Sequence, residues 1–462
     1  MSALSFDVQP PSSVDIRALR LRLNGDLVLP GEPGWDDARR AWNLAVDQHP
    51  FAVALVESEA DVVSVVQFAS LHGLRVAPQG TGHGASALES LEDVILVKTE
   101  RMRRVEIDAG SRTARAEAGA LWQDVVEPAA EQGFIVLHGS SPDVGVVGYT
   151  LGGGMGWLAR SRGLAANSVV AVELVTADGR LVRADRDNEP DLFWAIRGGG
   201  GSFGVVTAIE IRMYDAPELY AGAMFWPVER APEVLHAWRE WVETVPDDVT
   251  SVGRILHLPP VPDIPEPFRG KSFVLVEAVF TGPEAEGAAL TAPLRALGPE
   301  MDTFAAVLPT ALPHLHMDPP KPVPGVGDGM LLDELPPAAI EAMVATGTPP
   351  VLSLEVRPLG GKLAEASAGN GAVGALEAGF ALFAVGFAPT PEIGVAVEQA
   401  VDRIKAAFAP WESSRTYFNF AERGVAPERL YPAETFRRLR RVKAQYDGGE
   451  LFLANHPIPS AL

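Results

Sequence analysis

The sequence has 462 residues, enough for two or three domains, and its 47% hydrophobic and 21% charged residues are typical of a globular protein. A formal net charge of −22 argues against a nucleic acid or an anionic membrane as partner. Because there is no cysteine, disulfides, thiolate metal sites and cysteine nucleophiles are excluded. Residues 1–15 show no signal-peptide pattern and the longest apolar stretch, residues 378–389, is too short to span a membrane, so we expect a soluble, cytoplasmic protein.

The first recognisable unit is a strand, a helix and a strand. Residues 51–57 are short, apolar and β-rich, and residues 74–78 repeat that character. Between them Ser58 is a candidate N-cap, apolar residues recur at helical spacing, and Gly73 marks the end. This β-α-β unit leads directly into VAPQGTGHGAS, residues 76–86, where one histidine, His83, lies within a run of glycines.

Short strands and two further glycine runs follow. The pattern predicts strands at 94–98, 104–108, 113–119 and 134–139, a helix at 121–133, and a hairpin over 169–185 with Asp178-Gly179 as its turn. The second glycine run covers residues 148–163, and the third, residues 197–204, opens into a strand at 205–214.

From about Asp215 the chain has proline-rich loops between strands at 271–280 and 351–361, and a helix at 391–408. The last fifty residues predict one strand, which includes YFNF, then one helix and a terminal loop. We therefore expect residues 1–216, completed by 410–462, to form one domain and residues 217–409 a second one.

The glycine runs invite a Rossmann interpretation, which the sequence contradicts. Two of them match G-x-G-x-x-G/A, but that motif requires a crossover helix after it. The first match is followed by a segment too short for such a helix, and the second by a β-branched strand. No P-loop motif is present either. Three glycine loops in one half of the chain favour a long, charged ligand lying along exposed backbone, although ordinary turns are the alternative.

Several motifs in order carry a family resemblance. PQGTGHGAS, the stretch from SSPDVGVVGYTLGGGMGW to VTADG, DLFWAIRGGGGSFGVVT, YFNF and LFLANHPI resemble the vanillyl-alcohol oxidase/p-cresol methylhydroxylase flavoproteins, and most of all their berberine-bridge-enzyme-like branch. The resemblance covers residues 51–214 and the C-terminal tail. It implies an α+β fold, with a two-subdomain FAD-binding domain of the p-cresol methylhydroxylase type and a substrate domain built on a mainly antiparallel sheet.

The resemblance also implies a covalent flavin. By position, His83 is the histidine bonded to the 8α-methyl group of FAD. Many members of the branch have a second link through a cysteine, and Ser141 stands at that place, so a single link through His83 is expected here. The residues expected to bind FAD are Gln79, Gly80, Thr81, Gly82, His83, Gly84, Ser141, Val144, Gly145, Gly148, Gly152, Gly153, Gly154, Gly156, Trp157, Val205, Val206 and Asn455.

The expected chemistry is hydride transfer to the flavin with loss of a proton to a base. In the resembled branch, the tyrosine of YFNF lies near the flavin and often acts as base, which points to Tyr417, with Asn419 on the same face of the expected strand. Glu355, which alternates with apolar neighbours and shares a strand face with Arg357, is the second candidate, with a pKa raised by burial. Which of the two is the base remains open.

The resulting expectation is an FAD-linked oxidase that removes hydride from an alcohol or amine carbon of a small organic molecule, and passes the electrons to O2 to give H2O2. Val144 follows Ser141 by three places, where the resembled branch has a residue on the oxygen side of the flavin. The alternatives are a flavin dehydrogenase or a non-catalytic ligand-binding scaffold. His314, His316 and Asp318 in HLHMD are read as incidental, so no metal site is expected. Substrate identity and oligomeric state stay open.

Overall fold

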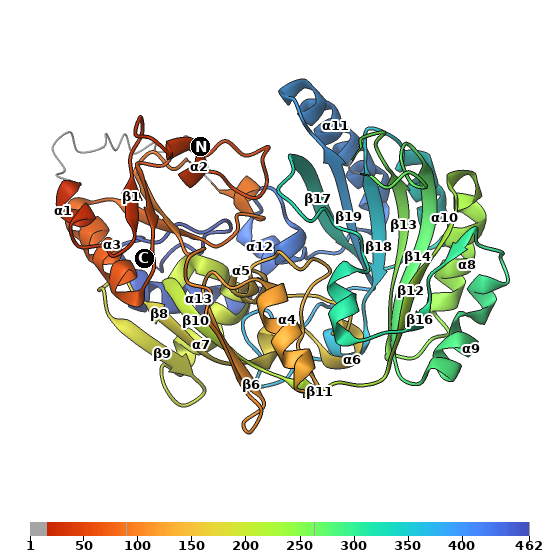
Figure 1. Ribbon diagram of the computed structural model, residues 1–462, viewed down its shortest axis with the longest axis horizontal. Coiled ribbons are helices and arrows are strands. Elements are labelled where there is room, and N and C mark those ends of the chain that lie inside the picture. Colours follow the sequence, from red (N-terminus) through yellow and green to blue (C-terminus); the bar gives the residue numbers. More distant parts are fainter. Residues whose placement is uncertain (1–15, 89, 263, 462) are drawn as a thin grey trace.

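The computed structural model describes residues 16–88, 90–262 and 264–461. The N-terminal stretch in which the sequence predicts no signal peptide lies outside the described residues. Figure 1 shows two halves side by side: the red-to-yellow part of the chain lies to the left, and a wide sheet of green and blue strands lies to the right. In the described part of the chain, no helix is both long and apolar enough to cross a bilayer.

The first sheet has four strands in the order β1-β2-β4-β3, of which β2, β4 and β3 are parallel. They are β1 (Asp26–Val28), β2 (Ala52–Leu55), β3 (Arg75–Gln79) and β4 (Val94–Lys98). The connecting helix α3 (Glu59–His72) is capped as the sequence predicts, since the Ser58 side chain accepts the backbone N–H of Asp61 and Gly73 adopts φ 67°. Between β3 and β4 the described residues, 80–88 and 90–93, contain the 3₁₀ turn Ala85–Ala87 and no crossover helix, as the rejection of a Rossmann site requires.

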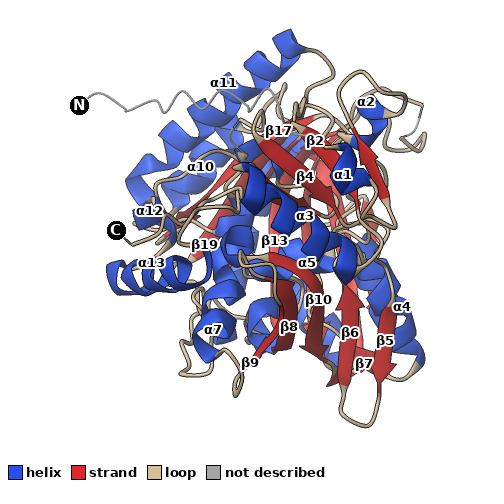
Figure 2. Ribbon diagram, turned by 90° about the vertical axis from the view of Figure 1, so that its left-hand side faces the viewer, coloured by secondary structure: helices blue, strands red, loops and turns tan. Residues whose placement is uncertain are grey.

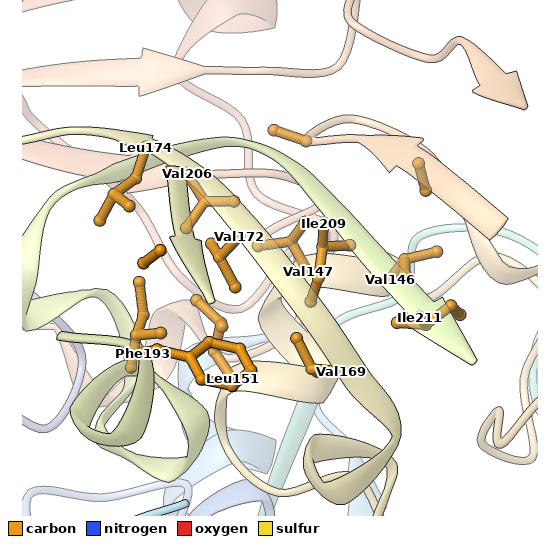
Figure 3. Packing of buried hydrophobic residues seen from close by; sticks show 14 of the residues in the cluster. Val146, Val147, Leu151, Val169, Val172, Leu174, Phe193, Val206, Ile209 and Ile211 are labelled. Atoms are coloured by element: carbon orange, nitrogen blue, oxygen red, sulfur yellow. The ribbon is translucent and has the colours of Figure 1, made fainter. Parts of the chain in front are cut away.

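The second sheet is antiparallel, in the order β5-β6-β10-β8-β9. Its strands are β5 (Val105–Asp108), β6 (Thr113–Glu117), β8 (Val169–Val175), β9 (Leu181–Asp185) and β10 (Val205–Arg212). Helices α4 (Trp122–Glu131), α5 (Val146–Leu151) and α7 (Pro190–Gly199) belong to the same half. Figure 3 shows Val147 and Leu151 of α5 packed with Val172, Val206 and Ile209 of the sheet. This apolar core holds α5, and the loops at both of its ends, in place.

The third sheet has eight antiparallel strands, in the order β15-β12-β14-β13-β18-β19-β17, with β16 also paired to β12. They are β12 (Leu219–Pro227), β13 (Val249–His257), β14 (Ser272–Thr281), β15 (Met301–Asp302), β16 (Ala305–Ala306), β17 (Gly325–Leu332), β18 (Ser353–Pro358) and β19 (Phe380–Phe387). Its helices are α8 (Ala231–Val242), α9 (Glu284–Arg295), α10 (Pro337–Thr346) and α11 (Pro391–Phe408). Helices α8, α9 and α10 cover the outer side, which leaves the other face toward the first half (Figure 1).

The C-terminal tail returns to the first half. Helix α12 (Pro427–Leu430) is followed by α13 (Ala433–Asp447), which packs against α7 (Figure 2) and against the 3₁₀ turn Gly200–Phe203. The last strand-like residue, Phe452, bridges to Val76 of β3. The remaining short elements are α1 (Arg17–Arg20), α2 (Trp35–Ala38), α6 (Ala159–Arg162), β7 (Phe134–Ile135) and β11 (Tyr214–Asp215).

Two predicted strands are wrong in extent or type. Of residues 134–139 only Phe134–Ile135 form a strand, paired with β11. The YFNF segment is not a strand: Phe418–Phe420 form a 3₁₀ turn in which Phe420 N–H bonds to the Tyr417 carbonyl. This turn packs on the bare backbone of Gly329, where an added Cβ would lie 2.7 Å from the Phe420 Cβ. The segment therefore satisfies its backbone internally rather than through a neighbouring strand.

Candidate active site

The first glycine loop begins at the carboxyl end of β3. Gly82 adopts φ 85°, and a Cβ there would lie 2.9 Å from the Ala41 Cβ, so only glycine fits at this position. Gln79 is buried and accepts a hydrogen bond from Gln48 at 3.0 Å, while its own amide nitrogen has no partner. The loop thus presents exposed backbone and an unsatisfied donor at one place.

His83 at the end of this loop is held on one side only. Its Nδ1 lies 2.7 Å from Thr81 Oγ1, and its ring stacks on Trp42 with centroids 4.1 Å apart. Its Nε2 is buried and has no hydrogen-bond partner. Burial lowers the pKa of His83 to about 4, although the carboxylates of Asp143 and Asp318 oppose this shift. At neutral pH the imidazole is therefore uncharged, as a nitrogen that forms a bond to carbon must be.

A second loop, residues 141–145, lies against the first. The Ser141 hydroxyl donates to Asp143 at 2.8 Å, and Trp42 Nε1 donates to the same carboxylate at 2.6 Å. The Asp143 carboxylate is 3.8 Å from His83 Nε2. A Cβ on Gly145 would lie 3.7 Å from the Thr81 side chain, which places the start of α5 beside the histidine loop. Ser141, Val144 and His83 therefore belong to one neighbourhood.

The GGGMG stretch after α5 serves mainly close packing. A Cβ on Gly152 would lie 1.8 Å from Asn419 Oδ1, one on Gly154 2.6 Å from the Tyr149 ring, and one on Gly156 1.8 Å from the His138 carbonyl. Gly148 differs, because an added Cβ there meets open space. Trp157 is buried beside the sheet, with its ring 6.1 Å from that of His316.

The remaining expected flavin contacts fall into two groups. Val205 and Val206 are buried in the cores on the two sides of β10, where they pair with Val175 and Leu174 of β8, so their side chains are not free to meet a ligand. Asn455 of the tail lies against the first loop, since a Cβ on Gly84 would be 3.2 Å from its side-chain nitrogen. The tail therefore closes over the histidine loop.

Tyr417 is placed by the glycine stretch. Its hydroxyl oxygen accepts the Met155 N–H at 2.8 Å, next to Gly153 and Gly154 at φ 117° and 76°. Burial raises the pKa of Tyr417 above that of a free phenol, while the backbone N–H groups of Met155 and Gly154 act in the opposite direction. Asn419 donates to the Tyr149 carbonyl at 2.9 Å, and this bond fixes the turn that carries Tyr417.

Glu355 lies in a buried chain of charged groups on the inner face of the large sheet. Its Oε1 bonds Arg357 at 2.7 Å and its Oε2 bonds His316 Nε2 at 2.7 Å, while His316 Nδ1 bonds Glu277 at 2.7 Å. The expected rise in the pKa of Glu355 is wrong. Burial does act to raise it, but Arg357 and His316 outweigh burial and hold the pKa of Glu355 well below its usual range.

Several residues here were not found from the sequence. His316 and Asp318, read as incidental, face the site, since Asp318 bonds Ser140 at 3.0 Å and its charge acts on His83, His316 and Arg357. Trp42 and Asp143 were missed because no sequence pattern around either residue indicates a place in the site. The buried Arg357 guanidinium lies over the Phe420 ring at 5.4 Å, close enough for its charge to act on Tyr417. Among residues 16–88, 90–262 and 264–461, no group of three potential ligands is placed to hold a metal ion.

The residues around His83 fit a flavin. An unpartnered imidazole nitrogen and an unpartnered amide of Gln79 lie at the end of β3 and in the loop after it, and open space lies above Gly148 in the first turn of α5. Residues 50–185 match the family model described as "FAD binding domain", and residues 416–459 match the one described as "Berberine and berberine like". Together these two matches support the berberine-bridge-enzyme-like flavoproteins as the family of this chain. Its α+β fold is the FAD-binding fold of this family.

Individual relatives show how far the likeness extends. The (R)-6-hydroxynicotine oxidase of Paenarthrobacter nicotinovorans is 33% identical over 210 residues, which are 45% of this chain and 46% of that protein. The glucooligosaccharide oxidase of Sarocladium strictum is 32% identical over 224 residues, 47% of this chain and 45% of that protein. The chain thus matches about half the length of these relatives. A solved structure, Physcomitrella patens BBE-like 1, superposes with a TM-score of 0.84 at 20% identity, covering 97% of this chain and 100% of that one.

Proposed function

We propose that this protein is an FAD-linked oxidase, with the flavin attached through its 8α-methyl group to His83. It removes hydride from an alcohol or amine carbon of a small organic molecule and passes the electrons to O2, which gives H2O2. The observation that carries the proposal is the buried, unpartnered Nε2 of an uncharged His83 at the end of a glycine loop. Similarity to a sugar oxidase and to a hydroxynicotine oxidase supports the substrate range.

We propose that the two parts of the chain, each with its own sheets, have different roles. Residues 1–216 with 410–462 hold FAD, by the loops after β3, before α5 and in the tail. Residues 217–409 cover the reacting end of the flavin with the inner face of the large sheet. The bond of Asn43 Nδ2 to the Gly325 carbonyl, at 2.9 Å, joins the two parts near Trp42 and supports a site between them.

Bound FAD supplies the hydride acceptor. When a carbinol or amine carbon gives up hydride, the attached O–H or N–H must lose a proton, and in this proposal the phenolate form of Tyr417 takes it. A phenolate oxygen there would be stabilised by the N–H groups of Met155 and Gly154 and by the charge of Arg357. The two electrons leave with the hydride, the proton converts a Tyr417 phenolate into the neutral phenol, and the product is a carbonyl or imine. Because burial raises the pKa of Tyr417, the phenol must first lose its own proton to solvent for the residue to act as this base.

Glu355 holds this arrangement rather than accepting the proton. Both of its carboxylate oxygens are occupied, one by Arg357 and one by His316, and its low pKa makes it a weak base. Its role in the proposal is to fix the Arg357 guanidinium near Tyr417. Glu355→Gln should therefore impair flavin reduction without abolishing it.

Val144 is proposed to leave oxygen a path to the reduced flavin. It is partly buried, packs against the core around α5, and lies beside the His83 loop. Val144→Leu adds one methylene group at this place. We expect it to slow reoxidation by dissolved O2 more than it slows reduction by substrate, and stopped-flow mixing of each half-reaction separates the two.

The direct test of the activity is oxygen uptake with a peroxide assay, over a panel of oligosaccharides, phenolic alcohols and hydroxynicotine-like amines. The proposal predicts saturable uptake with one panel class and one H2O2 formed per O2 consumed. If substrate bleaches the flavin but air restores its colour only over minutes, the dehydrogenase alternative replaces the oxidase.

A further inference from the structure

The buried charges around His316 form a chain that crosses three strands of the large sheet. His316 comes from the proline-rich loop between β16 and β17, and it enters between Glu277 of β14 and Glu355 of β18. Both of its ring nitrogens lie 2.7 Å from a carboxylate oxygen. Arg254 of β13 donates to the His316 carbonyl at 2.8 Å and to Ser353 at 2.8 Å.

Such an arrangement requires a charged imidazole, because each carboxylate accepts a hydrogen bond from one ring N–H. The groups that face His316 are Arg254 on β13, Glu277 on β14, Glu355 and Arg357 on β18, and Asp318 on its own loop, with the Trp157 ring at 6.1 Å. Burial and Arg254 lower its pKa, but Glu277, Glu355 and Asp318 outweigh them and raise the pKa of His316 to about 9.

Beyond His316, the row of buried charged groups continues through Glu355 and Arg357 toward Tyr417. Glu355 uses its second oxygen to hold Arg357 Nε at 2.8 Å, and Arg357 lies over the Phe420 ring beside Tyr417. If His316 were neutral, one of its two carboxylate contacts would lose its proton donor. Glu355 could then rotate, and Arg357 with it.

We propose that His316 is a positioning residue, which as an imidazolium tied to Glu277 and Glu355 holds Arg357 at the proton-accepting Tyr417. This inference rests on the proposed function, since it assigns Tyr417 to proton transfer. His316 itself does not touch the reacting atoms: it acts through Glu355. Its role gives flavin reduction a dependence on pH that a purely structural residue would not give.

The test combines two readouts on the flavin-loaded full-length protein. In the first, side-chain NMR of protein labelled at histidine, assigned by the signal missing in His316→Gln, follows the charge of His316 against pH. We expect an imidazolium that persists to about pH 9, and in Glu277→Gln a pKa lower by about 1 unit or more, because one of its two carboxylates is gone. Titration of His316 near its ordinary value would overturn the proposal.

In the second readout, anaerobic flavin reduction by substrate is followed against pH. The wild type should lose rate on an alkaline limb, which Glu277→Gln moves to lower pH and His316→Gln removes, with a rate lower by about 10- to 100-fold. Flavin content and reoxidation by O2 should stay within twofold. His236→Gln is the matched control, since His236 pairs with Glu341 at 2.8 Å on the outer surface of the same half.

The two readouts separate the possible failures. If no panel substrate reduces the flavin, the proposed function fails, whereas the NMR titration still decides the charge of His316. If reduction proceeds in all variants with unchanged pH profiles, His316 has no positioning role and the proposed function stands.

Discussion

Tyr417 owes its place to glycines that are distant in the sequence. Its hydroxyl reaches the Met155 N–H only because Gly153 and Gly154 turn the backbone through positive φ, and because Gly152 leaves room for Asn419. Two residues of YFNF and three glycines of GGGMG thus form one structural unit. An alanine at Gly152 would displace the turn that carries Tyr417.

The first residue-scale prediction concerns Tyr417→Phe. Removing the hydroxyl should lower the rate of flavin reduction by about 10²- to 10⁴-fold, the usual contribution of a positioned base. Flavin content should be unchanged, because Tyr417 is not a proposed attachment site. Anaerobic stopped-flow with substrate measures the rate, and Tyr446→Phe is the control, because the Tyr446 hydroxyl bonds Glu189 just before α7. A loss of less than threefold would remove Tyr417 from the mechanism.

At this scale the sequence supplied single residues but not their partners. The alternation in LSLEVRP put Glu355 and Arg357 on one strand face, and the structure pairs them at 2.7 Å. The direction of the pKa shift was wrong because His316, the third member, arrives from a loop about forty residues earlier whose path no local pattern predicts. Trp42 and Asp143 were missed for the same reason.

Helix α13 shows how an element with no catalytic residue holds the tail in place. Its Lys443 and Asp447 form a fully buried pair at 2.5 Å. Lys443 also donates to the Ser202 carbonyl at 2.8 Å, and Asp447 accepts the N–H groups of Leu451 and Phe452. The pair therefore ties the third glycine run to the segment that leads to Asn455.

The element-scale prediction is a large loss of stability in Lys443→Met. The exchange leaves the Asp447 carboxylate buried without a countercharge, which costs about 3–5 kcal/mol in the free energy of unfolding. Urea denaturation followed by circular dichroism measures it. Arg437→Met, at an exposed position of the same helix, should change the free energy by less than about 0.5 kcal/mol. Equal losses of unfolding free energy in the two variants would contradict a stabilising role of the buried pair.

Elements with a clear period were predicted well, and short segments held by tertiary contacts were not. Helix α3 has a capping serine and a terminal glycine, and α11 begins and ends where the sequence predicts. Residues 136–139 and the YFNF turn have apolar, strand-like composition, but their backbones bond locally or to distant loops. Composition cannot distinguish these two situations.

For the whole molecule, Glu422 joins three distant parts of the chain. Its carboxylate accepts the Ser86 hydroxyl just after the histidine loop, and its N–H donates to Asp328 of β17 at 3.1 Å. Burial raises the pKa of Glu422 to about 7, with Asp328 adding to the shift and Ser86 opposing it. The charged carboxylate is thus disfavoured where the tail, the first loop and the large sheet meet.

The whole-molecule prediction is a stability that falls between about pH 4.5 and 7. A carboxyl group whose pKa is raised on folding binds more protons in the folded state, so its penalty is absent below the unfolded pKa and complete above the folded one. Glu422→Gln should flatten this part of the curve and raise stability at pH 8. Urea titrations at four pH values measure it, and Glu428→Gln, an exposed change in the same tail, should leave the slope as it is. Parallel curves for all three proteins would contradict the role of Glu422.

The order of strands in the sheets could not be predicted from the sequence. That the second half forms a mainly antiparallel sheet followed from a resemblance. The pairing of β18 with β13, which brings Glu355 beside Arg254, instead depends on contacts between residues about a hundred positions apart. This strand order decides which side chains share the inner face of the sheet. It therefore also decides that the buried charged groups Glu277, His316, Glu355 and Arg357 lie next to one another.

The central claim is that FAD is bonded to His83, and acid precipitation of the purified protein tests it most directly. The account predicts that flavin stays with the pellet, fluoresces in the protein band after denaturing electrophoresis, and maps by mass spectrometry to the peptide that contains His83. In His83→Ala the flavin should appear in the supernatant, because the glycine loop and Gln79 still bind it without a bond. Flavin released from the wild type, or retained covalently by His83→Ala, would contradict the account.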